Sequence, residues 1–171
     1  MNRAVKESAD TLYIICDTSG SMFENGKSMI MRGVAGTAGQ YIRLYGVPAG
    51  IKLLSWNKNI SEVEWNADDE YPEKMLKYRA PSEGCPPADF FETITGGKIL
   101  LLSDGFWTGG EGKIFKELES RLPPGAVRII TIGPDYNPYI KSGNISGPDE
   151  ILGVLDEWFH ASNAEARGGE L

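Results

Sequence analysis

The chain has 171 residues, of which 41% are hydrophobic, and it carries a formal net charge of -7 at pH 7 with a sequence pI near 4.8. A single domain of this length buries roughly 70% of the surface that its unfolded chain exposes, and the acidic excess argues against nucleic-acid or anionic-membrane binding. The two cysteines, Cys16 and Cys85, argue against a disulfide framework and against a Cys-based structural zinc site.

The first predicted element is a strand at residues 11–16, TLYIIC, which is apolar along nearly its whole length. Strands that are covered on both faces have this composition, so we expect this one at the centre of a sheet. Its apolar run is far too short for a secretion signal or a membrane span, and we therefore expect a cytoplasmic protein. A helix follows the next loop and ends near Gly46. Apolar residues at steps of four and three predict its buried face, formed by Ile30, Val34, Ala38, Tyr41 and Tyr45.

Two strands are predicted at residues 50–56 and 59–65, and the second alternates apolar and polar residues as an antiparallel edge strand does. The remaining predicted elements are a short helix at 88–94, a buried strand at 98–104, a helix at 111–122, a strand at 126–133, a loop at 133–147 and a last helix at 148–159. The alternation of strands and helices predicts an α/β fold with a largely parallel sheet. We expect one domain over residues 1–160 and a flexible C-terminal tail over 161–171.

Small polar residues follow the first buried strand, in the loop Asp-Thr-Ser-Gly-Ser at residues 17–21. Asp17, Ser19 and Ser21 occupy alternate positions, so their oxygen atoms can turn toward one point. Asp104 directly follows the second buried strand, and neighbouring parallel strands present their carboxyl ends at one edge of a sheet. Mg²⁺ prefers oxygen ligands of this kind and keeps several waters. The pattern therefore indicates a metal site at this edge.

A second interpretation of the same loop starts at Ser21. Residues 21–28, SMFENGKS, differ at one position from the phosphate-binding pattern G-x-x-x-x-G-K-[ST]. In that case the chain is a P-loop-like nucleotide-binding enzyme, with Lys27 on the phosphates and Asp104 holding magnesium. This interpretation lacks the first glycine and gives Asp17 no role, so we favour the metal site. A third interpretation, a plain helix cap with a glycine turn, explains single residues of the loop but does not account for the paired Asp104.

The segment IICDTSGSM, together with the later LLLSDG, resembles the von Willebrand factor A (vWA) domain and its metal-ion-dependent adhesion site. Among vWA domains, the short chain resembles the bacterial intracellular forms associated with tellurium resistance or with MoxR-type ATPases. The resemblance implies a three-layer, doubly wound, Rossmann-like fold with one antiparallel edge strand. It also implies a bound Mg²⁺, with Mn²⁺ or Ca²⁺ as alternatives. The implied protein ligands are Asp17, Ser19, Ser21 and Asp104, and a carboxylate of the partner completes the coordination.

One ligand of the family pattern is missing from this chain. The family has a threonine in a Gly-Gly-Thr loop, and the corresponding stretch here is Ser-Glu-Gly-Cys at residues 82–85. A thiol is a poor ligand for Mg²⁺, so Ser82, Glu83 or water has to stand in for the threonine beside Cys85. A degenerate vWA scaffold that has lost the metal is therefore a further alternative.

Large apolar residues occur in three loops that leave the carboxyl ends of predicted strands, and aromatic residues around a polar centre are typical of binding hot spots. The predicted rim consists of Met22, Phe23, Phe106, Trp107, Tyr136 and Tyr139. The only histidine, His160, lies at the end of the last helix, which argues against Ser-His or Cys-His catalysis. We therefore expect a metal-dependent protein-interaction module of a bacterial complex, not an enzyme. Its partner would be a protein that offers Asp or Glu, such as an AAA+ ATPase or a component of a kinase or phosphatase system.

Overall fold

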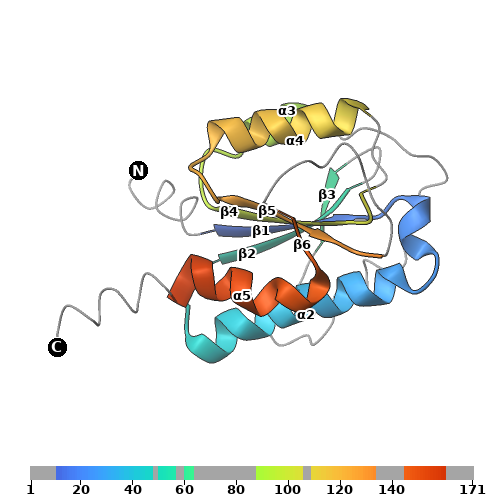
Figure 1. Ribbon diagram of the computed structural model, residues 1–171. Helices are drawn as coiled ribbons and strands as arrows, with labels where there is room; N and C mark the ends of the chain where they lie inside the picture. Colours follow the sequence, from blue (N-terminus) through green and yellow to red (C-terminus); the bar gives the residue numbers. More distant parts are fainter. Residues whose placement is uncertain are drawn as a thin grey trace.

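A six-stranded, mostly parallel sheet forms the middle layer of the fold (Figure 1). The structure is a computed structural model that describes residues 11–47, 50–56, 60–63, 88–105, 109–133 and 145–160. Its strands are β1 (Thr11–Asp17), β2 (Gly50–Trp56), β3 (Ile60–Val63), β4 (Lys98–Ser103), β5 (Val127–Thr131) and β6 (Ile145–Ser146). Their order across the sheet is β3-β2-β1-β4-β5-β6, and only the β2–β3 pair is antiparallel. The predicted fold class, with one antiparallel edge strand, is confirmed.

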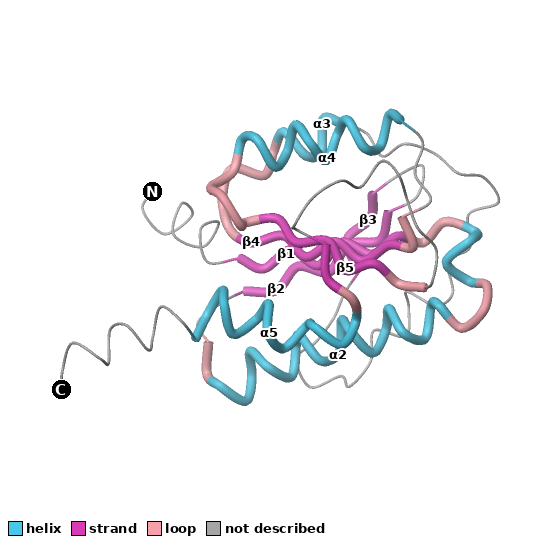
Figure 2. Tube along the Cα trace, viewed as in Figure 1, coloured by secondary structure: helices cyan, strands magenta, loops and turns pink. Residues whose placement is uncertain are grey.

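Helices cover both faces of this sheet and complete the three layers. The helices are α2 (Lys27–Tyr45), α3 (Ala88–Glu92), α4 (Gly109–Arg121) and α5 (Ile151–Leu155), with short 3-10 turns η1 (Gly20–Phe23) and η3 (Pro148–Glu150) and a π-helical turn η4 (Asp156–His160). Figures 1 and 2 show α3 and α4 on one face of the sheet and α2 and α5 on the other. Among the described residues, no helix is both long and apolar enough to cross a membrane.

The central strand β1 serves two separate hydrophobic cores. All seven of its residues are buried, because successive side chains point to opposite faces and both faces carry helices. Leu12, Ile14 and Cys16 pack in the core under α2 and α5, whereas Tyr13 and Ile15 pack in the core under α3 and α4. Cys16 is a core residue, and its complete burial raises the pKa of its thiol above the usual range.

The buried face of α2 differs from the predicted one. Ile30 is 43% exposed and Tyr45 is 59% exposed, although both were predicted to be buried. Met31, Ala35 and Ile42 are buried in their place, beside the correctly predicted residues Val34, Ala38 and Tyr41. The face that packs on the sheet is therefore rotated around the helix, and Tyr45 lies in the last turn, where α2 ends at the left-handed Gly46.

Two segments near the C-terminus also differ from the prediction. The loop predicted at residues 133–147 contains β6, whose two residues pair with β5 and are too few to carry a periodic signal. The single helix predicted at 148–159 is a run of 3-10, α- and π-helical turns over residues 148–160. The tail predicted at 161–171 lies outside the described residues.

A pair of leucine substitutions tests this assignment of the core. Leu101 in β4 is fully buried, whereas Leu44 in α2 is 77% exposed. Leu101→Ala should lower the free energy of unfolding by about 2–5 kcal/mol, because it removes buried methyl groups and leaves a cavity. Leu44→Ala should change that free energy by no more than about 0.5 kcal/mol. Urea denaturation of both variants measures the difference, and equal losses would contradict the assignment.

Candidate functional site

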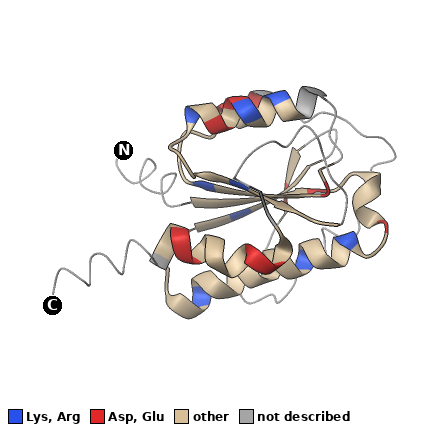
Figure 3. Ribbon diagram, viewed as in Figure 1, with Lys and Arg blue, Asp and Glu red and all other residues tan. Residues whose placement is uncertain are grey.

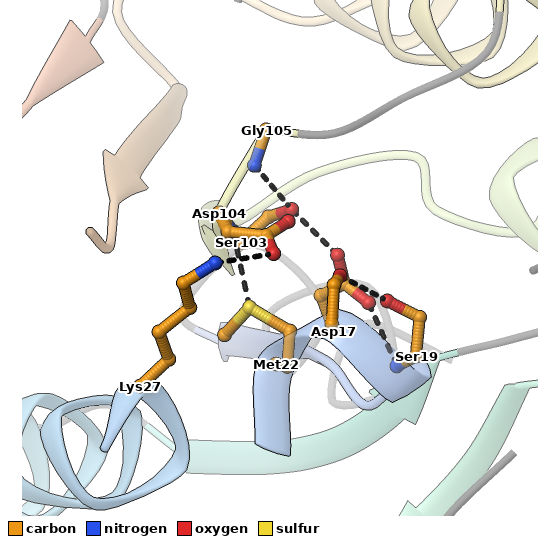
Figure 4. Close-up of polar contacts among 8 residues, drawn as sticks. Asp17, Ser19, Met22, Lys27, Ser103, Asp104 and Gly105 are labelled. Carbon is orange, nitrogen blue, oxygen red and sulfur yellow. Dashed lines mark hydrogen bonds and ion pairs between the residues drawn. The ribbon is translucent and has the colours of Figure 1, made fainter. Parts of the chain in front are cut away.

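Two buried carboxylates meet at the carboxyl edge of the sheet. Asp17 is the last residue of β1 and Asp104 follows β4, which pairs with β1 in parallel. The two residues are 3% and 1% exposed, respectively. Figure 4 shows the carboxyl groups of Asp17 and Asp104 close to each other. Strand topology alone brings together two acidic groups that lie 87 positions apart in the sequence.

Hydrogen bonds from both sides fix the carboxylate of Asp17. Its Oδ1 accepts the backbone N–H of Ser19 at 2.9 Å, and its Oδ2 accepts the hydroxyl of Ser103 at 2.6 Å (Figure 4). The backbone N–H of Gly105 donates to Ser103 Oγ at 3.1 Å, which orients this hydroxyl. Ser103 was not among the predicted site residues. A polar residue at the end of an apolar strand, directly before Asp104, was the signal that could have identified it.

The pKa of Asp17 is raised from its ordinary value of 3.8 to about 6. Burial is the main cause, because it removes water from the charged form. The hydrogen bonds from Ser103 and Ser19 act in the opposite direction, and the negative charge of Asp104 raises the pKa further. The ionised carboxylate is thus poorly solvated, which is the condition under which a nearby cation stabilises it most.

The loop after β1 directs its serines toward Asp17 and ties its threonine to the neighbouring strand. Ser19 Oγ and Ser21 Oγ lie 3.4 Å apart, and both side chains are partly exposed. Thr18 points the other way, and both its backbone N–H and its hydroxyl donate to the carbonyl oxygen of Trp56, at 2.7 and 3.1 Å. The structure thus groups Asp17, Ser19 and Ser21 on one side of the loop.

A lysine belongs to the site as well. Lys27, the first residue of α2, is only 4% exposed, and its Nζ lies 3.3 Å from Asp104 Oδ2 (Figure 4). The left-handed residues Asn25 and Gly26, with φ of 52° and 76°, form the turn that precedes it. From the sequence, Lys27 was predicted only as a phosphate ligand, because the residues around Gly26 do not indicate a contact with the distant Asp104.

The predicted rim needs one correction. Met22 is fully buried, and its sulfur accepts the backbone N–H of Asp104 at 3.1 Å, so it supports the site from within and offers no surface to a partner. Phe23 is partly buried and packs against the core under α2. The other rim residues and the third-loop candidates lie outside the described residues: Phe106, Trp107, Tyr136, Tyr139, Ser82, Glu83 and Cys85.

The donor set at this edge fits a hard divalent cation in its chemistry. Two carboxylates and two hydroxyls are oxygen ligands of the type that Mg²⁺, Mn²⁺ and Ca²⁺ take. No three His, Cys, Asp or Glu side chains come together to hold a metal in the part of the chain that the structure describes. Among the described residues, a metal here would be held by Asp17, Asp104 and the serine hydroxyls. One oxygen of Asp104 already faces the ammonium of Lys27.

The pKa of Asp17 predicts an unusual pH dependence for the metal-free chain. Its pKa is higher in the folded state than in the unfolded state, so the folded state binds the proton more tightly and this residue favours folding more as the pH falls. Between about pH 7.5 and about pH 4.5 the contribution should grow by about 2 kcal/mol. Asp17→Asn has no titrating group at this position and therefore lacks this contribution. The free energy of unfolding of the variant minus that of the wild type should be about 2 kcal/mol more positive at about pH 7.5 than at about pH 4.5. Urea denaturation in EDTA measures both proteins, and a difference that does not change with pH would contradict the assignment.

Comparisons with known proteins show similarity at the level of structure. No protein-family model matches the chain, and a search of characterised proteins gave no match. The ArnB paralog VWA2 from Sulfolobus acidocaldarius matches with 22% identity and a TM-score of 0.50, over 86% of this chain and 45% of the archaeal one. This chain thus spans less than half of that protein.

Two further solved structures match this chain over most of its length and over most of their own. The manganese-loaded TRAP protein of Plasmodium vivax matches with 13% identity and a TM-score of 0.53, over 87% of this chain and 72% of the TRAP chain. BatB from Bacteroides thetaiotaomicron matches with 13% identity and a TM-score of 0.52, over 78% and 72%. Together with the sheet order and the two helical layers, these similarities show that the chain has the von Willebrand factor A fold.

Proposed function

We propose that the chain is a metal-dependent protein-interaction module that binds an acidic side chain of a protein partner at the carboxyl edge of its sheet. The observation that carries the proposal is the meeting of Asp17 and Asp104 beside the hydroxyls of Ser19 and Ser21. The structural similarity to a TRAP protein that was solved in a manganese-loaded form supports it. The role that we assign to this site is binding and not catalysis.

Each residue has a distinct part in this proposal. Asp17 and Asp104 supply the charged oxygens, and Ser19 and Ser21 supply neutral ones. Ser103 and the N–H of Ser19 hold the Asp17 carboxylate in one orientation, so that little ordering is needed when a cation binds. The bound divalent ion would offer a Lewis-acidic position to a carboxylate of the partner.

The partner that we propose is a protein with an exposed Asp or Glu, in a bacterial cytoplasmic complex. An AAA+ ATPase, or a component of a kinase or phosphatase system, is the class that the sequence resemblance implies. The net charge of -7 supports a partner other than nucleic acid or an anionic membrane. A partner with a basic surface around one acidic side chain would complement this charge.

Removal of one ligand tests the metal and the partner together. Asp17→Asn keeps the size of the side chain but removes a charged ligand, so Mn²⁺ affinity by calorimetry and metal-dependent capture of the partner should both be lost. EDTA should have the same effect on the wild type. Asp89→Asn removes an exposed carboxylate of α3 and serves as the control, with affinity and capture unchanged. Capture that survives both Asp17→Asn and EDTA would refute the metal bridge.

The supporting hydroxyl of Ser103 gives a second, graded test. Ser103→Ala leaves all proposed ligands in place but removes the hydrogen bond to Asp17 Oδ2. Mn²⁺ affinity should fall by roughly 10- to 100-fold, the usual effect of losing a residue that orients a ligand. Ser120→Ala is the matched control, since Ser120 is exposed on α4 and donates only to a helix carbonyl. Equal affinities of the two variants would show that Ser103 does not orient the site.

A further inference from the structure

The ion pair between Lys27 and Asp104 is almost completely shielded from water. The side chains are 6% and 0% exposed, and Nζ lies 3.3 Å from Oδ2. The other carboxylate of the site is held differently, because Asp17 accepts hydrogen bonds from the neutral donors Ser19 N–H and Ser103 Oγ. Within the site, the positive charge therefore lies on the Asp104 side.

We propose that Lys27 is a built-in counter-ion that competes with the divalent metal for Asp104. The inference rests on the proposed function, because it concerns the same metal. In the metal-free chain the ammonium offsets one of two buried negative charges, and without it both carboxylates would be desolvated beside each other. Lys27 thus places a positive charge beside Asp104 when no metal is bound.

Metal binding at Asp104 then requires the ammonium to move away. If the carboxylate of Asp104 held a divalent ion, that ion and the ammonium would share one carboxylate, and like charges in a shielded environment repel each other strongly. The long, flexible lysine stem permits such a movement. Lys27 also starts α2 directly after the turn at Asn25 and Gly26, so its side chain can swing toward solvent while the helix stays in place. The cost of this step lowers the intrinsic affinity for metal.

Other basic residues of the sheet are not placed to act in this way. Lys98 is the first residue of β4, Arg128 is the second residue of β5, and Lys52 lies in the first half of β2. These positions lie toward the amino ends of the strands, away from Asp17 and Asp104, and Figure 3 shows the basic positions of the strands on that side. The competition that we propose therefore comes from the position of Lys27 at the start of α2. The basic residues of the strands do not have this position.

Calorimetry with Mn²⁺ alone tests the competition. Lys27→Met removes the ammonium and keeps most of the stem, so the variant should bind Mn²⁺ at least about tenfold more tightly than the wild type, a factor that corresponds to about 1.4 kcal/mol. Lys52→Met removes the same charge from an exposed position of β2 and should bind like the wild type. A Lys27→Met variant with equal or weaker affinity would overturn the proposal.

A measurement on the wild type does not depend on the folding of any variant. Acetylation of lysine side chains by an N-hydroxysuccinimide ester, read by mass spectrometry, reports how accessible each ammonium is. In EDTA, Lys27 should react much more slowly than the exposed Lys52, and saturating Mn²⁺ should accelerate Lys27 and leave Lys52 unchanged. If Mn²⁺ left the rate at Lys27 unchanged or lowered it, the displacement of the ammonium would be refuted.

The outcomes separate this inference from the proposed function. If neither the wild type nor Lys27→Met binds Mn²⁺ at millimolar concentration, the metal-dependent function fails and the competition fails with it. If both bind with the same affinity, the metal site stands and only the role of Lys27 is wrong.

Discussion

The parallel pairing of β1 and β4 is the constraint on which the site depends. It aligns the ends of two strands that are distant in sequence, so that Asp17 and Asp104 emerge together. The pairing holds because β1 is buried on both faces and contributes side chains to both hydrophobic cores. The free energy of burying these apolar residues therefore also positions two carboxylates that would otherwise avoid each other. The packing of β1 therefore determines both the stability of the core and the geometry of the site.

The site combines groups that stabilise negative charge in different ways. Ser103 and the N–H of Ser19 orient the carboxylate of Asp17 without neutralising it, which leaves its pKa raised to about 6. Lys27 places a full positive charge next to Asp104. The buried sulfur of Met22 accepts the N–H of Asp104, a weak interaction that satisfies the backbone without adding charge. Of the two carboxylates, Asp104 therefore faces a cation, whereas Asp17 is held by neutral hydrogen-bond donors.

The sequence predicted most of the fold because its signals were local and strong. Continuous apolar runs identified β1 and β4, and alternation identified the edge strand β3. The two-residue strand β6 gave no periodic signal, and the orientation of α2 depends on tertiary packing that apolar spacing alone does not fix. At the site, the motif positions were visible in the sequence, but Ser103 and Lys27 act through contacts across 86 and 77 positions. Such contacts follow from strand register and from the packing of α2 on the sheet, which a single sequence does not reveal.

The anchoring of Thr18 has a consequence for how this fold tolerates change. Both donors of Thr18 bind the carbonyl oxygen of Trp56, and every amino acid supplies a carbonyl oxygen at that place. The loop is therefore anchored to a main-chain atom, and this anchor does not depend on the side chain of Trp56, which packs in the core. A loop anchored in this way keeps its place even when the side chain at position 56 is replaced, so the oxygen atoms of Asp17, Ser19 and Ser21 can keep their arrangement while the neighbouring core changes.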